Sequence, residues 1–147
     1  MSRPNLNFGG KVSFFNEDSG KPYVNMKEDV EMAIEYGVDG VVISNHGERQ
    51  VDGVPAAIDA LRECEPVARR KIQIGLEGGI RRGSDAFKAL ALGAQHCFVG
   101  RVPLWGLAYN GQNGVQLSMT ILHRELKTMM ALARDVNRIS IFMRVAN

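Results

Sequence analysis

The chain has 147 residues, of which 45% are hydrophobic, and its formal net charge is +2. This length predicts one domain that buries roughly two thirds of its unfolded surface, and the hydrophobic content excludes an intrinsically disordered chain. The small net charge leaves no strongly basic face, so we expect no binding of nucleic acid and no attachment to a membrane.

Two short β-prone runs lie near the amino terminus, over residues 10–15 and 21–24, and the turn-rich segment 16–20 lies between them. Two such runs around a short polar connector are typical of a β-hairpin. We therefore predict a hairpin-like extension over residues 1–25 and a larger α/β unit over residues 26–147.

The α/β unit begins with a predicted helix over 27–36 and a buried strand over 40–43, which Ser44, His46 and Arg49 follow. An imidazole exchanges a proton near neutral pH, and a guanidinium group matches a carboxylate with two hydrogen bonds. A strand that ends in such side chains presents them at the carboxyl edge of a parallel sheet. We predict His46 as a general base and Arg49 as a carboxylate clamp, although a loop histidine is more often a solvated or capping residue than a catalyst.

A second strand, over 71–76, precedes a predicted helix over 84–92. The turn between them contains Glu77, Gly78, Gly79, Ile80 and Arg81. Glycine lets backbone N–H groups approach an anion, a helix amino terminus favours negative charge, and arginine supplies a forked cation. The turn therefore predicts a phosphate cradle, and without its arginines it would be an ordinary strand-to-helix turn.

A third strand, over 96–99, ends in Gly100 and Arg101, so three strands bring polar residues to one edge. Apolar residues at helical spacing predict a last helix from about 113 to 134, and Trp105 and Tyr109 are expected to pack the loop before it. The helix, glycine and strand of residues 33–44 recur over 89–100, which indicates a repeated αβ module.

The two cysteines, Cys64 and Cys97, are placed on a predicted helix and in a predicted strand. The chain has no CxxC motif and no secretory stretch at its amino terminus, which favours reduced thiols and a cytoplasmic location. We predict no metal site.

Four motifs occur in the order SNHGERQ, EGGIRRGSDAFKALALGA, FVGR and LWGLAYNGQNGV. They resemble the carboxyl-terminal half of the FMN-dependent α-hydroxy acid oxidases and dehydrogenases, the family of glycolate oxidase and the flavin-dependent L-lactate dehydrogenases. The resemblance covers residues from about 27 to about 133. It implies an oxidoreductase acting on CH–OH groups with FMN as cofactor, and it makes residues 26–147 the carboxyl-terminal half of a TIM-type (β/α) barrel.

The resemblance also implies roles for individual residues. His46 would take the hydroxyl proton of a small carboxylated substrate while a hydride passes to the flavin, and Arg49 would hold the substrate carboxylate. The implied cofactor-binding residues are Ser44, Glu77, Gly78, Gly79, Ile80, Arg81, Gly100 and Arg101.

Several features depart from the family pattern. A complete barrel typically needs about 250 residues, so half of it is absent from this sequence. Pro22 stands where the family has a lysine that contacts the flavin, Glu48 replaces a small residue, and Glu77 replaces an aspartate. An open half-barrel exposes an apolar face and unpaired strand edges, so we expect a homo-oligomer or a complementing chain.

Two other functions remain open at this stage. A flavin-free enzyme could retain His46 and Arg49 for redox-neutral acid–base chemistry, namely isomerisation, cyclisation or elimination. Alternatively, the chain could be a non-catalytic remnant that binds an anion or a partner. Yellow colour in the purified protein would favour the flavin enzyme, and colourless protein with turnover that depends on His46 would favour the flavin-free enzyme.

Overall fold

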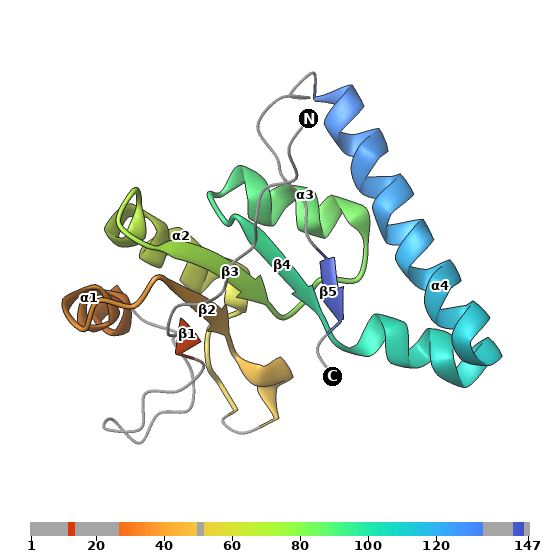
Figure 1. Ribbon diagram of the computed structural model, residues 1–147, viewed down its shortest axis with the longest axis horizontal. Coiled ribbons are helices and arrows are strands. Elements are labelled where there is room, and N and C mark those ends of the chain that lie inside the picture. Colours follow the sequence, from red (N-terminus) through yellow and green to blue (C-terminus); the bar gives the residue numbers. More distant parts are fainter. Residues whose placement is uncertain (1–11, 14–26, 50–51, 134–142, 146–147) are drawn as a thin grey trace.

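The computed structural model describes residues 12–13, 27–49, 52–133 and 143–145. Within these residues, parallel strands form one sheet in the order β1-β2-β3-β4-β5 (Figure 1). The strands are β1 (Val12–Ser13), β2 (Gly40–Ser44), β3 (Gln73–Glu77), β4 (His96–Val99) and β5 (Met143–Val145). The architecture is therefore a partial parallel α/β sheet, as expected for a truncated barrel.

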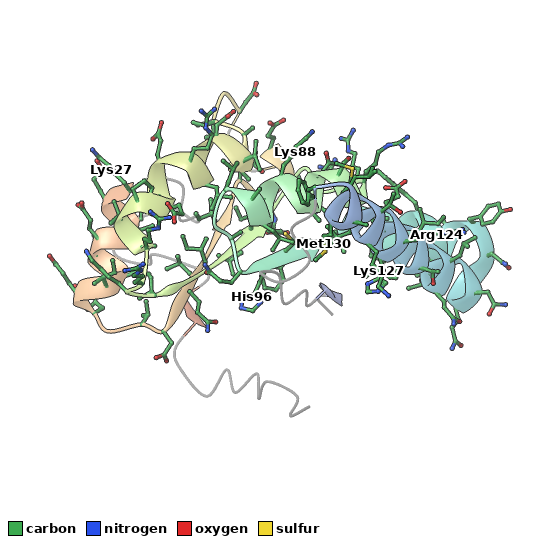
Figure 2. All side chains as sticks on the ribbon, turned by 90° about the horizontal axis from the view of Figure 1, so that it is seen from above. Lys27, Lys88, His96, Arg124, Lys127 and Met130 are labelled. Carbon is green, nitrogen blue, oxygen red and sulfur yellow. The ribbon has the colours of Figure 1, made fainter. Side chains whose placement is uncertain are left out.

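Helices cross between the strands, as parallel pairing requires. They are α1 (Lys27–Glu35), α2 (Ala57–Ala68), α3 (Gly83–Ala91) and α4 (Arg101–Leu132), and a short 3₁₀ helix, η1 (His46–Glu48), follows β2. Seen from above, α2 and α3 lie on one side of the sheet, whereas His96 projects from the opposite side (Figure 2). None of the described helices covers this second side, the helix-free face, which would be the inner face of the expected barrel.

The hydrophobic core lies between the strands and the helices. Ile43 of β2 and Leu76 of β3 are fully buried in one cluster with Leu61 of α2 and Leu126 of α4. Since successive side chains of a strand point to opposite faces, the next residue after Ile43 and the next after Leu76 lie on the helix-free face. The alternation thus separates the structural core from the polar positions at the strand ends.

The helix-free face is closely packed at its centre. An added Cβ on Gly75 would lie 2.6 Å from Cε2 of Phe98 and 3.4 Å from Cγ2 of Val42, so the aromatic ring covers this glycine. Near the amino ends of the strands, His96 Nε2 lies 3.2 Å from Gln73 Oε1. Burial lowers the pKa of His96, because the charged imidazolium loses part of its hydration.

The longest helix, α4, differs from the sequence prediction. It begins at Arg101, directly after β4, and not near residue 113. A kink at Asn110 and Gly111, where φ of Gly111 is +52°, divides it into two parts whose backbones meet at Gly106 and Gly114. A Cβ on either glycine would collide with the backbone of the other, so this close contact needs glycine at both positions.

The first part of α4 also corrects the expectation for the residues after β4. Trp105 and Tyr109 were expected to pack a loop, but they lie on a helix and are 54% and 81% exposed.

The second part of α4 packs closely against the start of α3. Gly83 of α3 lies so near the backbone N of Leu126 that there is no room for a Cβ at this position. The N–H of Gly83 donates to Oε2 of Glu125 at 2.8 Å, which ties the start of α3 to α4.

Most predicted elements are confirmed with small shifts of their ends. The strand predicted from residue 71 begins at Gln73, because Arg70 has a φ of +62° and the N–H groups of Lys71 and Ile72 bond to the carbonyl of Ala68 in a turn. The sequence indicated no strand at the position of β5. Among the described helices, none combines the length and hydrophobicity that a bilayer crossing requires.

The predicted amino-terminal hairpin falls almost entirely outside the described residues. Of its two runs, only Val12 and Ser13 are described, and they pair in parallel with Gly40 and Val41 at the edge of β2. The second run and Pro22 lie outside the described residues. The division into residues 1–25 and 26–147 therefore stays a prediction.

Candidate active site

The loop after β2 carries the predicted acid–base residues in an unusual conformation. His46, Gly47 and Glu48 have φ values of +52°, +65° and +61°, so three successive residues are left-handed. Three hydrogen bonds support the turn: His46 N–H donates to Ser44 Oγ (3.0 Å), Gly47 N–H to Asn45 Oδ1 (3.1 Å) and Glu48 N–H to the carbonyl of Asn45 (2.9 Å). Such strain is kept where surrounding contacts determine it, and it concentrates at functional sites.

The ends of β2 and β3 are joined by a pair of polar side chains. Ser44, which is 6% exposed, donates a hydrogen bond of 2.5 Å to Oε2 of Glu77. The register places the two residues side by side on the helix-free face. Both were predicted to contact the cofactor, and the structure brings them together.

The glycine-rich turn after β3 lies directly beside the loop after β2. Gly78 and Gly79 have φ values of +114° and +75°, which L-residues with a Cβ rarely adopt. An added Cβ on Gly78 would lie 3.1 Å from Asn45 Oδ1 and 3.2 Å from the Cβ of Ala57. Gly79 instead borders open space, so a ligand can approach its backbone.

The carboxylate of Asp85 fixes the start of α3. Its Oδ2 accepts from the N–H groups of Arg81 at 3.2 Å and Arg82 at 3.0 Å. The helix begins at Gly83, and its side-chain cap comes from Asp85. The cap holds the turn that carries Arg81 at the amino terminus of a helix, where an anion is favoured.

Arg101 links the end of β4 to the loop after β2. An added Cβ on Gly47 would lie 3.0 Å from Nη2 of Arg101, so the guanidinium group rests against the backbone of that loop. Gly100, immediately before it, has an ordinary φ of −105° and borders open space. The ends of β2, β3 and β4 therefore meet as the sequence predicted.

A cavity of about 260 Å³ opens where these three strand ends meet. Five predicted residues line it: Gly78, Gly79, Ile80, Arg81 and Arg101. His46, Arg49, Ser44, Glu77 and Gly100 are not among its lining residues. His46 and Arg49 are exposed on the loop after β2, so the structure separates the acid–base pair from the cavity.

Sequence reasoning missed three polar side chains of the cavity, Asn45, Asp85 and Lys88. The Lys88 ammonium group lies 3.9 Å from Asp85 Oδ1, one helical turn away along α3. That i,i+3 spacing after a capping aspartate was the available signal. The cavity therefore has three cationic side chains, Arg81, Lys88 and Arg101, and two carboxylates, Glu48 and Asp85. The excess of positive charge suits a bound anion.

The thiols take no part in this site. Burial raises the pKa of Cys97 to about 12, and burial together with nearby carboxylates raises the pKa of Cys64 to about 11. A thiol with such a raised pKa is a poor nucleophile at neutral pH. Within the part of the chain that the structure describes, no three His, Cys, Asp or Glu side chains are grouped to hold a metal ion.

Comparison with known proteins shows the family of this chain. The sequence profile of the FMN-dependent dehydrogenases matches residues 24–140. The chain belongs to this family. It is 58% identical to Oxidase FUB9 of Gibberella fujikuroi over 71% of its own length, and 48% identical to 2-Hydroxyacid oxidase 1 of Homo sapiens over 72%. The resemblance predicted from the motifs is thereby confirmed.

Solved structures give the same relationship in three dimensions. A mandelate oxidase bound to benzoylformic acid superposes with a TM-score of 0.72 at 40% identity, over 75% of this chain and 33% of the other. A mandelate oxidase variant carrying the monooxide FMN adduct superposes equally well, over 35% of its chain. The two curated relatives are likewise covered over only 29% of their lengths, so this family member spans under a third of each.

Proposed function

We propose that this chain forms part of an FMN-dependent oxidoreductase that oxidises a small α-hydroxy acid. The observation that carries the proposal is the convergence of Arg81, Arg101 and the glycine-rich turn on one cavity at the carboxyl ends of β2, β3 and β4. Ligands of α/β sheets bind at this end of the strands. Relatives named as oxidases of 2-hydroxy acids support the reaction class.

The phosphate of FMN fits the charge and backbone of this cavity. Arg81 and Arg101 supply forked donors, Lys88 adds a point charge, and the open backbone at Gly79 lets N–H groups approach the anion. By family resemblance, Ser44, Glu77 and Gly100 complete the cofactor contacts beyond the phosphate. Bound FMN would supply the hydride acceptor that no side chain provides.

His46 and Arg49 would act on the substrate itself. The imidazole of His46 accepts the hydroxyl proton of the α-hydroxy acid, and the guanidinium group of Arg49 holds the carboxylate with two hydrogen bonds. Both residues follow β2 on the same short loop, whose left-handed turn brings them out of the core and toward solvent. They would face the substrate while the residues of the cavity hold the cofactor.

We further propose that another polypeptide segment completes the site. The sheet leaves its helix-free face for the residues of a barrel that this chain does not contain, and a homo-oligomer or a complementing chain would supply them. A cytoplasmic location agrees with two cysteines that are both free and buried. Light scattering of the purified chain tests the assembly: an oligomer is expected, and a stable monomer would contradict it.

One experiment tests the proposed reaction. The chain is purified, its absorption spectrum is recorded with added FMN, and bleaching by glycolate or lactate is followed without oxygen. Arg101→Ala should weaken FMN binding by about 1.5 to 3 kcal/mol, the range for a charged hydrogen bond. Arg124→Ala is the matched control, because Arg124 is exposed on α4 and lines no part of the cavity (Figure 2).

The outcomes separate the oxidoreductase from a chain that only binds an anion. Binding of FMN with bleaching by a hydroxy acid supports the oxidoreductase. Binding without bleaching by any hydroxy acid favours an anion-binding chain. Failure of the unmodified chain to bind FMN would contradict the proposal.

A further inference from the structure

The loop that carries His46 is held in a conformation that it would not adopt by itself. Two of its left-handed residues, His46 and Glu48, carry a Cβ, and each such residue costs about 1 to 3 kcal/mol. The loop nevertheless turns sharply beside the cavity, so specific contacts must stabilise it. Asn45, at the start of the loop, makes two of the three supporting hydrogen bonds.

Asn45 occupies a tightly built position. It is 7% exposed, its Oδ1 accepts the N–H of Gly47, and its carbonyl accepts the N–H of Glu48. The same Oδ1 lies so near Gly78 that a Cβ there would be only 3.1 Å away. One buried side chain therefore touches both the loop after β2 and the turn after β3.

The other end of this amide, Nδ2, has no hydrogen-bond partner among the described residues. Among the described residues, none accepts a hydrogen bond from Nδ2 of Asn45, although Asn45 is more than nine-tenths buried and lines the cavity. A buried polar group without a partner costs about 1 to 3 kcal/mol, so such a group in a cavity indicates a missing acceptor. The cationic side chains that line the cavity, Arg81, Lys88 and Arg101, favour an anionic acceptor.

We infer that Asn45 is a further functional residue of the site with a separate task for each end of its amide. Oδ1 positions the loop that carries His46 and Arg49, and Nδ2 donates to the phosphate of the ligand in the cavity. The second task rests on the proposed function, whereas the first does not. The sequence pattern did not indicate a role for Asn45, because an asparagine after a strand is an ordinary residue of a turn.

Two substitutions separate the two tasks. Asn45→Asp keeps an oxygen that accepts from Gly47 but removes the donor and adds a negative charge near the anion. Asn45→Ala removes both the acceptor and the donor. Asn113→Ala, at an exposed position of α4 outside the cavity, is the matched control.

The readouts are amide hydrogen exchange of Gly47 in the free chain and binding of inorganic phosphate and of FMN. Gly47 should exchange about fivefold to tenfold faster in Asn45→Ala and at the original rate in Asn45→Asp, since one neutral hydrogen bond is lost only in the former. Anion affinity should fall about tenfold in Asn45→Ala and further in Asn45→Asp. If Asn45 only supported the loop, Asn45→Ala would be the more strongly affected variant both in the exchange of Gly47 and in anion affinity.

Three results would overturn the inference. Unchanged exchange of Gly47 in Asn45→Ala would show that Asn45 does not position the loop. Anion binding by Asn45→Asp as tight as that of the original chain would show that Nδ2 does not donate to the ligand. If the original chain binds neither phosphate nor FMN, the proposed function and the second task fail together, and the exchange of Gly47 still decides the first. Asn45→Leu, which has a similar shape and no hydrogen-bonding group, replaces the alanine variant if the latter does not fold.

Discussion

Replacing Gly78 with alanine tests the geometry at the centre of the site. Its φ of +114° is strained for any residue with a Cβ, which costs about 1 to 3 kcal/mol. The new Cβ would also lie 3.1 Å from Asn45 Oδ1 and 3.2 Å from Ala57 Cβ, and overpacking of this kind adds about 1 to 3 kcal/mol. We therefore expect Gly78→Ala to lower the free energy of unfolding by about 2 to 6 kcal/mol.

Two other glycines of the site, Gly79 and Gly100, separate the cost of backbone strain from the cost of the close contacts. Gly79 has a φ of +75° but open space around it, so Gly79→Ala should cost only about 1 to 3 kcal/mol. Gly100 has an ordinary φ and open space, so Gly100→Ala should change stability by less than about 1 kcal/mol. Urea unfolding followed by circular dichroism measures all three variants. Equal losses for Gly78→Ala and Gly79→Ala would refute the close approach of Asn45 to the turn.

Three further predictions concern packing, chemistry and pH. Gly83→Ala should lower the melting temperature strongly, because its Cβ would collide with the backbone of Leu126 and push α4 from α3, and an unchanged melting curve would contradict this packing. His46→Ala should reduce hydroxy acid oxidation by about a hundredfold to ten-thousandfold, the usual loss for a general base, and turnover at the original rate would exclude the role. Burial lowers the pKa of His96 below its ordinary value of 6.5. As the pH falls, His96 is therefore protonated in the unfolded chain before it is protonated in the folded chain. The free energy of unfolding should therefore decrease as the pH falls below about 6.5, and a pH titration of His96→Asn should lack this contribution.

Much of the fold could be predicted because strong local patterns agreed with the tertiary structure. The strands at 40–43 and 96–99 are apolar runs that end in glycine or polar residues, and both are present as β2 and β4. The start of α4 could not be read in the same way. Glycine has low helix propensity, and only the structure explains the three glycines of this helix: Gly106 and Gly114 allow its two parts to meet, and Gly111 adopts the positive φ of the kink.

The sequence predicted several residues of the site correctly, but it did not predict which of them line the same cavity. Glycine and arginine after a strand indicated an anion cradle, and Arg81 and Arg101 do line one cavity. That His46 lies outside this cavity depends on a left-handed turn, which the residue types at 46 and 48 do not indicate. Asn45 was overlooked because its importance comes from burial and from contacts with residues of another loop.

The central claim is that Arg81, Arg101 and the glycine-rich turn bind the phosphate of FMN. Riboflavin shares the flavin and ribityl groups but lacks the phosphate, so fluorescence titrations with both ligands measure the phosphate contribution directly. We predict that the chain binds FMN at least about tenfold more tightly than riboflavin, as expected for one or more charged hydrogen bonds, and that Arg101→Ala reduces this preference. Equal affinities for the two flavins in the unmodified chain would contradict the account.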